Sequence, residues 1–342
     1  MYPFSWLYGI VVSLRNFCYD RKIFRIEKAG IPVISVGNMT VGGTGKTPLV
    51  EYLVRYLSGK GKKVAVLSRG YGRSASQQYA VGAGETDRGN AASLGDEPYQ
   101  IAKKFPHATV IANPSRRDAA RVAVQNYGAE IVVLDDGFQH RVLARNLDIL
   151  VINGDNPIEK EPLLPAGRRR EPLSALRRAN VIAYSWKNGK KKDLVKLSVN
   201  NTPSINVGFK PLCFRSLDGS SPIGLSDLKG KACVAFCGIA DPAPFREMLE
   251  QCGLVIKDFL KFPDHHVFAP TDFARIVRAT ESNSVDCIIT TEKDAARLSA
   301  ADREIFLQRK DSRSCYLEIE AVIIDGEPIF HTMIDNAVNA TI

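Results

Sequence analysis

The chain lacks several features that would place it in a specialised class. It has no run of about 18 uncharged apolar residues, which excludes a polytopic membrane protein. Its seven cysteines are an odd number, with no C-x-x-C pair and no Cys/His spacing typical of a metal site. Cys233 and Cys237 lie in a strand-like run and are about 13 Å apart, beyond the disulfide limit of about 7 Å. We therefore expect reduced thiols in a cytosolic protein.

The remaining composition is globular, with an excess of positive charge. The 342 residues are 45% hydrophobic and 24% charged, which excludes a largely disordered chain, a collagen-like chain and a disulfide scaffold. At about 150 residues per domain, the length predicts two domains. The 46 lysines and arginines against 37 aspartates and glutamates give a net charge of +9. This charge predicts an anionic partner (phosphate, nucleic acid or anionic lipid) without choosing among them.

The first 14 residues carry no charged side chain and are followed by several cations. A signal peptide has the opposite order, and the segment is too short to span a bilayer. Two interpretations stay open for residues 1–30: a helix packed on the domain, or an amphipathic interfacial helix whose following cations meet anionic lipid. In the second, the side chains that enter the headgroup boundary are Phe4, Trp6, Leu7, Tyr8 and Ile10.

Strand-like and helical segments alternate along the rest of the chain. This alternation predicts an α/β fold whose parallel sheets are covered on both faces by helices. Prolines and scattered polar residues around 197–222 indicate a domain junction. The expected parts are a core domain at 31–207, a smaller α/β domain with hinge strands at 208–325, and a tail or helix at 326–342.

The strongest local signal is a glycine-rich turn between a strand and a helix. It reads V-G-G-T-G-K-T at 41–47, a variant of the phosphate-binding loop in which Thr40 stands at the usual first glycine. Lys46 can reach the β- and γ-phosphates of a nucleotide, and Thr47 can ligate Mg²⁺. The helix N-terminus adds the positive end of its dipole. The loop residues expected to cradle the phosphates are Gly42, Gly43, Thr44 and Gly45.

A second motif consists of four apolar residues followed by Asp135 and Asp136. A carboxylate at the C-terminal end of a strand can hold Mg²⁺ directly or through water. Many strands also end in an aspartate that only caps a turn, so the motif gains its meaning from the loop above. Adjacent side chains diverge in an extended backbone, and we expect the two carboxylates to have different roles.

Other polar motifs are less specific, and each has a structural alternative. Asp96 begins a helix, either as a functional carboxylate or as its N-cap. His265 lies in a proline-flanked loop, where a histidine is often only a surface residue. The T-T-E-K-D run at 290–294 either meets a nucleotide or caps a helix. It is not the guanine-reading N-K-x-D pattern, which favours ATP over GTP.

Eight motifs resemble tetraacyldisaccharide 4′-kinase, the lipid A pathway kinase of Gram-negative bacteria, and the resemblance as a whole runs from about residue 5 to 325. They are G-N-M-T-V-G-G-T-G-K-T-P (37–48), S-R-G-Y-G-R (68–73), G-D-E-P (95–98), L-D-D-G-F-Q-H (134–140), L-P-A-G-R-R-R-E-P (164–172), F-C-G-I-A-D-P (236–242), F-P-D-H-H (262–266) and T-E-K-D-A-A-R-L (291–298). The resemblance implies two P-loop-like α/β domains joined by a short β hinge, with the nucleotide in the cleft.

The resemblance also implies an activity and a location. The enzyme would transfer the γ-phosphate of ATP, with Mg²⁺, to the 4′-hydroxyl of a tetraacylated glucosamine disaccharide 1-phosphate, forming lipid IVA. It would do so as a peripheral protein on the cytoplasmic face of the bacterial inner membrane. The partners expected are therefore the acylated lipid and an anionic membrane surface.

By motif position, the resemblance assigns roles to individual residues. It implies that Asp96 is the catalytic base, with His265 as its partner and Lys46 at the phosphates. The acidic metal positions fall on Asp135 and Asp136, with Thr47. Nucleotide contacts fall on Glu292, Lys293 and Asp294. The residues implied at the lipid substrate are Arg69, Tyr71, Arg73, Gln139, His140, Arg170 and Glu171. One departure is Arg169, where the family pattern has an apolar residue.

Elementary chemistry agrees with this assignment. A hydroxyl attacking a phosphoryl group needs in-line positioning and charge neutralisation more than covalent catalysis. A protein-partnered switch ATPase is the alternative, since similar loops occur there. A nucleic-acid partner is not expected, because the basic runs lack interleaved aromatics and no recognition module is visible. We expect a monomer.

Overall fold

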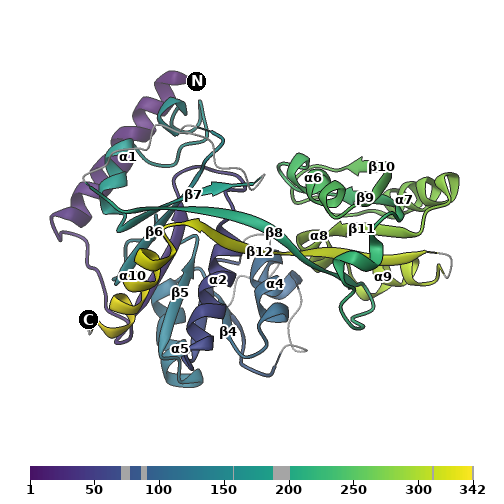
Figure 1. Ribbon diagram of the computed structural model, residues 1–342. Coiled ribbons are helices and arrows are strands. Elements are labelled where there is room, and N and C mark those ends of the chain that lie inside the picture. Colours follow the sequence, from purple (N-terminus) through teal and green to yellow (C-terminus); the bar gives the residue numbers. More distant parts are fainter. Residues whose placement is uncertain (71–77, 86–90, 157, 188–200, 310–311, 341–342) are drawn as a thin grey trace. The chain divides into compact units, whose positions relative to one another are not determined.

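The computed structural model describes residues 1–70, 78–85, 91–156, 158–187, 201–309 and 312–340, which form two compact units (Figure 1). Unit 1 comprises Met1–Gly208 and Ala321–Ile342, and unit 2 comprises Phe209–Glu320. Strands β8 (Ser204–Ser216) and β12 (Arg313–Asp325) each cross a unit boundary. The chain therefore leaves unit 1 along β8 and returns along β12.

Unit 1 is built on a sheet of order β8-β7-β6-β1-β5-β2-β4-β3. Its pairs from β8 to β4 are parallel, and only β3 runs antiparallel on β4. Val36 of β1 is level with Asp135 of β5, so the segments that follow these two strands leave the sheet side by side. The strands are β1 (Val33–Asn38), β2 (Val64–Ser68), β3 (Tyr79–Val81), β4 (Thr109–Ala112), β5 (Ile131–Asp135), β6 (Leu147–Asn153) and β7 (Val181–Trp186).

Helices cover both faces of the unit 1 sheet. Alternate residues of β1, β2, β4 and β5 pack with three alanines of α5 in one core cluster. The residues between them, such as Ile34 and Val66, are equally buried, and α2 packs on β1, β2 and β5. The helices are α1 (Tyr2–Asp20), α2 (Lys46–Gly59), α3 (Ala91–Leu94), α4 (Asp96–Lys104), α5 (Arg116–Tyr127) and α10 (Glu327–Asn339), with 3₁₀ turns at Ile158–Lys160 and Leu173–Arg178.

Unit 2 has a parallel sheet of order β10-β9-β11-β12. Its core is rich in aromatic rings: Phe236 stacks on Phe306 and meets Phe268 edge to face. The elements are a 3₁₀ turn (Leu225–Leu228), β9 (Ala232–Cys237), α6 (Ala243–Gln251), β10 (Val255–Lys261), α7 (Pro270–Asn283), β11 (Cys287–Thr291), α8 (Glu292–Arg297) and α9 (Ala300–Leu307). The predicted α/β class with mostly parallel strands is confirmed.

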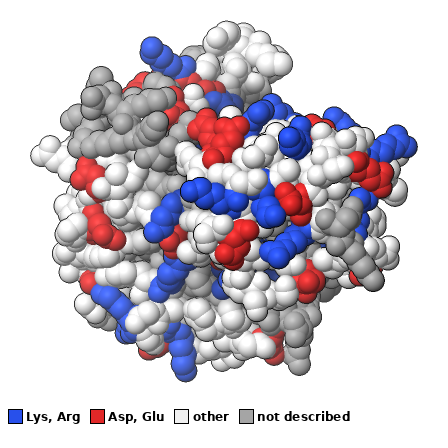
Figure 2. All heavy atoms as spheres, turned by 45° about the vertical axis from the view of Figure 1, so that its right-hand side comes forward, with Lys and Arg blue, Asp and Glu red and all other residues white. Residues whose placement is uncertain are grey.

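Two surface properties bear on the sequence expectations. Among the described residues, none of the helices combines the length and the hydrophobicity that crossing a membrane requires. On the face shown in Figure 2, lysines and arginines are interspersed with aspartates and glutamates rather than gathered into one patch. All seven cysteines are free thiols, with Cys233 and Cys237 buried.

Candidate active site

The glycine-rich loop occupies the gap between β1 and α2. Gly42 and Gly45 have φ angles of 107° and 81°, which residues other than glycine rarely adopt. Asn38, at the end of β1, donates from Nδ2 to Oγ1 of the buried Thr44 at 3.0 Å, which ties the loop to the strand. The chain then enters α2 at Lys46, so the first turn of that helix carries Lys46 and Thr47. This is the geometry of a phosphate-binding loop.

Asp135 ends β5 and Asp136 follows it, beside this loop, and the surroundings of the two carboxylates differ. Asp135 is 2% exposed; its Oδ2 accepts from the Ser68 hydroxyl at 3.3 Å, and its Oδ1 has no hydrogen-bond partner. Asp136 has a φ of 51°, in the left-handed region. Its Oδ1 lies 3.5 Å from Lys46 Nζ, and its Oδ2 accepts from Arg170 Nη1 at 2.8 Å.

The pKa values of the two carboxyls move in opposite directions. Burial, together with the charges of Glu97 and Asp136, raises the pKa of Asp135 to about 7. Burial would also raise the pKa of Asp136, but the cations Lys46 and Arg170 outweigh it and hold that pKa below its usual value. The expectation of different roles therefore has a physical basis: Asp136 is committed to cations, whereas Asp135 is a buried acid with an unused oxygen.

A short polar chain extends from Asp136 toward the expected lipid side. Arg170 Nη1 also reaches Gln139 Oε1 at 3.3 Å, and Gln139 Nε2 donates to the Asn38 carbonyl at 2.9 Å. Lys46, Asp136, Arg170 and Gln139 thus form one continuous cluster. The neighbouring strand β1 needs glycine at position 37, because a Cβ there would sit 2.5 Å from the Phe138 backbone nitrogen.

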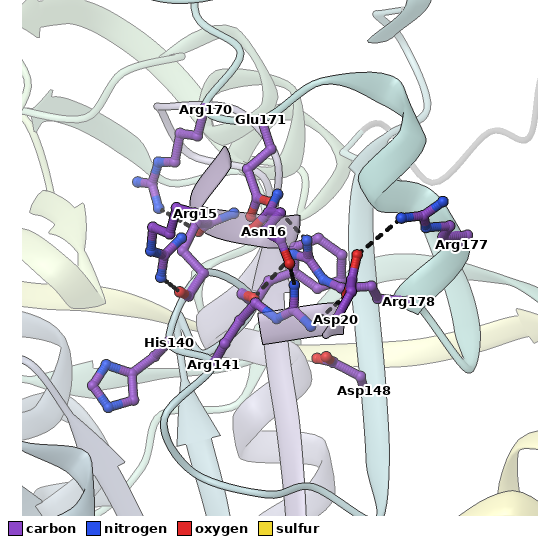
Figure 3. Close-up of polar contacts among 12 residues, drawn as sticks. Arg15, Asn16, Asp20, His140, Arg141, Asp148, Arg170, Glu171, Arg177 and Arg178 are labelled. Carbon is purple, nitrogen blue, oxygen red and sulfur yellow. Dashed lines mark hydrogen bonds and ion pairs between the residues drawn. The ribbon is translucent and has the colours of Figure 1, made fainter. Parts of the chain in front are cut away.

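Glu171 lies beside this cluster, among contacts that hold helix α1 (Figure 3). It is 1% exposed and receives Arg178 at 2.7 and 2.9 Å and Asn16 Nδ2 at 2.7 Å. Burial would raise the pKa of Glu171, but Arg178 and Asn16 together lower it. Arg15 of α1 also donates to the Gln139 carbonyl. These contacts tie α1 to the segments that carry Gln139, Arg170 and Glu171.

The other residues expected at the lipid are less well connected. Burial, together with the charges of Arg116 and Arg145, lowers the pKa of His140 to about 4, so its ring is neutral at pH 7. Arg69 is exposed at the end of β2. Tyr71 and Arg73 lie outside the described residues.

Asp96 is the first residue of α4, and the N-cap is Gly95 with a φ of 94°. The N-cap alternative for Asp96 is therefore wrong: Asp96 and Glu97 form the acidic first turn of the helix. The effect of Glu97 on the pKa of Asp135 indicates that this turn lies near the end of β5.

In unit 2, His265 adopts a left-handed φ of 58° and is 40% exposed at its side chain. Lys293 Nζ lies 3.2 Å from its Nε2, and Arg297 Nη2 lies 3.2 Å from its Nδ1. Thr291 caps α8 by accepting from the Asp294 amide at 3.1 Å. The helix-capping alternative for the T-T-E-K-D run is thus present, and nucleotide contacts by Glu292, Lys293 and Asp294 stay a prediction.

Comparison with known proteins decides the family. The family model described as tetraacyldisaccharide-1-P 4′-kinase matches residues 1–339. The chain belongs to this family. It is 36% identical over 334 residues to the tetraacyldisaccharide 4′-kinase of Anaeromyxobacter sp. (strain K), covering 96% of this chain and 87% of that one. It is 40% identical over 301 residues to that of Syntrophotalea carbinolica, covering 87% and 82%.

A solved structure agrees with these matches. The "apo" form of LpxK from Aquifex aeolicus, crystallised in complex with ATP, superposes with a TM-score of 0.80 at 32% identity and covers 98% of each chain. The family predicted from the eight motifs is therefore confirmed. The alternative of a protein-partnered switch ATPase has no support among these matches.

Sequence reasoning missed several residues that hold the site of this 4′-kinase family member together. Asn16, Ser68 and Arg178 were not singled out, although each hydrogen-bonds a buried acidic residue. Ser5 and Asn16 are polar residues on the buried face of α1, and a polar residue at a helical spacing from buried apolar ones was the available signal for Asn16. Tyr8 was expected in the headgroup region, but its hydroxyl donates to the Arg170 carbonyl at 2.8 Å, so it faces the protein.

Proposed function

We propose that this chain transfers the γ-phosphate of ATP to the 4′-hydroxyl of a tetraacylated glucosamine disaccharide 1-phosphate. The observation that carries this proposal is the cluster of Lys46, Asp136 and Arg170 beside the buried Asp135, whose Oδ1 has no hydrogen-bond partner. This cluster connects the phosphate-binding loop with Arg170, a cation that can bind the substrate that accepts the phosphate. The family membership supplies the identity of that acceptor.

The residues present fit a Mg²⁺ ion. Asp135 Oδ1 is a buried oxygen with no hydrogen-bond partner, next to a second carboxylate, and Thr47 lies in the first turn of α2. Within the described ranges no group of three or more His, Cys, Asp or Glu side chains could hold a metal. Mg²⁺ usually takes only one or two carboxylates and completes its shell with phosphate and water. When bound, it would neutralise charge on the phosphates.

The chain's own residues would do the rest. Lys46 and the loop amides hold the β- and γ-phosphates, and Arg170 balances charge on the acceptor side. Asp96 takes the proton from the 4′-hydroxyl. As it does so, the hydroxyl oxygen bonds to the γ-phosphorus, and the bond between the γ-phosphorus and the β-phosphate oxygen breaks. An Asp96→Asn variant should lose about 10²–10⁴-fold in kcat, and retention of most activity would contradict the role of Asp96 as base.

We also propose that α1 brings the enzyme to the anionic cytoplasmic face of the inner membrane, where an acylated substrate resides. The exposed fractions of Trp6, Leu7 and Ile10 are 74%, 58% and 45%, while Asn16 faces inward. Replacing these three apolar residues by serine should weaken binding to anionic vesicles more than it weakens ATP affinity. Equal vesicle binding by the variant and the wild type would contradict the docking role of α1. The monomeric state is testable by sedimentation in detergent.

The decisive experiment is a transfer assay with γ-³²P-ATP and detergent-dispersed disaccharide 1-phosphate. Label should appear in the lipid product for the wild type and be lost in Lys46→Ala. ATP turnover without lipid label would point instead to an ATPase. In that case the acceptor roles of Asp96 and Arg170 would fall.

A further inference from the structure

Unit 1 contains a buried ion pair that the roles discussed above do not use. Glu51 of α2 and Lys104 of α4 approach to 2.7 Å between Oε2 and Nζ, and their side chains are 2% and 6% exposed. Gln100 of α4 donates from Nε2 to the other oxygen, Oε1, at 2.8 Å. One carboxylate oxygen of Glu51 thus accepts a hydrogen bond from α4, and the other is ion-paired with it.

The stability of the fold is a weak reason for such a pair. Removing two charges from water costs much of what their attraction returns, and apolar residues of similar volume often serve equally well. What an ion pair with an added hydrogen bond provides is direction. It fixes where one helix stands along the axis of the other, whereas apolar side chains tolerate small slides.

The spacing along each helix connects this contact with the reacting end of the unit. Asp96, Gln100 and Lys104 are four residues apart, so they follow one face of α4. Thr47 and Glu51 are also four apart and share one face of α2. The contact therefore joins the helix face that begins with Asp96 to the helix face that begins with Thr47.

We propose that Glu51, Gln100 and Lys104 are positioning residues that set the register of α4 against α2. They would thereby fix the base Asp96 relative to the phosphate-binding loop. The proposal rests on the kinase function proposed above. It predicts a large effect on turnover, because a displacement of about 1 Å can cost about 10²-fold in rate.

The test replaces the charged side chains by apolar ones of similar volume, so that the directional contact between the helices is lost while the packing is kept. Single replacements would leave a buried charge without its partner and destabilise the fold. We therefore choose the double variant Glu51→Met with Lys104→Met. Its melting temperature and its dissociation constant for ATP should stay near the wild-type values, while kcat in the lipid-labelling assay falls about 10- to 100-fold.

The same helix provides a matched control. Lys60, directly after the last residue of α2, pairs with Asp335 of α10 at 2.5 Å, with side chains 45% and 38% exposed. Lys60→Met with Asp335→Leu removes a charged pair at the far end of α2 and should leave kcat unchanged. A third variant, Gln100→Leu, keeps the ion pair and should lower kcat by a smaller factor.

Each outcome of these experiments either supports or overturns the positioning role of the three residues. A folded double variant with wild-type kcat overturns the proposal, as does an equal loss in the control pair. If the double variant does not fold, Gln100→Leu decides in its place, and wild-type kcat in that variant overturns the proposal. If the wild type itself labels no lipid, the kinase function fails, and the positioning role falls with it.

Discussion

Each unit buries an aspartate near the end of a parallel strand, and the two are treated in opposite ways. In unit 2, Asp294 is fully buried and its oxygens accept from the Gly238 amide, the Thr291 hydroxyl and Arg297 at 3.0, 2.6 and 2.9 Å. In unit 1, Asp135 is almost as buried, yet one of its oxygens has no hydrogen-bond partner. Burial raises the pKa of both carboxyls.

The difference distinguishes a buried carboxylate that the chain itself satisfies from one that is left able to bind a ligand. A carboxylate whose oxygens are satisfied by its own chain joins the segments that donate to it. A carboxylate left with an unused oxygen among other acids is costly unless a cation compensates it. The fold keeps Asp135 in that state, and this is the physical argument that it serves a ligand. The predictions below test this contrast.

The largest expected effect is on the stability of unit 2. Asp294→Ala leaves the Arg297 guanidinium, 8% exposed, without its counter-charge and should cost about 3–5 kcal/mol of unfolding free energy. Urea unfolding of the full chain measures it. The control is Glu250→Ala, which breaks an ion pair with Arg246 whose side chains are both 52% exposed and should cost at most about 1 kcal/mol. Equal costs for the two variants would contradict the contrast.

Asp135→Asn should show the reverse pattern. The amide keeps the shape but removes the charge, so kcat should fall about 10²–10³-fold. The unfolding free energy should stay equal or rise, because a buried charge beside Asp136 and Glu97 is gone. Steady-state kinetics and urea unfolding on one preparation test both statements. A variant that loses stability and keeps its activity would show that Asp135 serves the fold rather than a ligand.

The architecture and the family followed from sequence because both depend on local pattern. Alternating strands and helices predicted the α/β class, which the structure confirms, and the loop at 41–47 with the two aspartates predicts where the phosphates bind. The glycine-rich loop is recognisable because its function requires special backbone angles within a few residues, as Gly42 and Gly45 show. Such constraints act on residues that are adjacent in the sequence, so a local pattern reveals them.

What could not be predicted depends on pairs that are distant in sequence. Asn16 and Glu171 are 155 positions apart, and nothing local in either segment specifies the other. Strand β10 has little signal in the sequence, because most of its residues are at least partly exposed and it lacks a continuous apolar run. The contrast between Asp135 and Asp294 was equally hidden, since both follow strand-like segments and differ only in the donors that the tertiary fold brings to them.

The pH dependence of stability offers a finer test of Asp135. Its pKa rises from 3.8 in the unfolded chain to about 7 in the fold, so the folded state binds this proton more tightly. The resulting stability is complete below about pH 4 and is lost as the pH rises through about 7. Relative to Asp135→Asn, the metal-free wild type should lose unfolding free energy across this range. Added Mg²⁺ should reduce the loss, and parallel curves with and without Mg²⁺ would contradict the cation assignment.

The smallest effect concerns Glu171, a third buried carboxylate, whose oxygens are satisfied as those of Asp294 are. Asn16→Ala removes one of its three donated hydrogen bonds and should cost about 1.5–3 kcal/mol at neutral pH. The pKa of Glu171 is lowered in the fold, so its contribution is present above about pH 4.5 and is lost as the pH falls. The cost of Asn16→Ala should therefore shrink in acid. Tyr8→Phe, which removes a hydrogen bond from the same helix to the neutral Arg170 carbonyl, should cost less and stay constant with pH. If the Asn16→Ala cost is also constant, Asn16 holds α1 by packing, and the charge of Glu171 does not help to fix that helix.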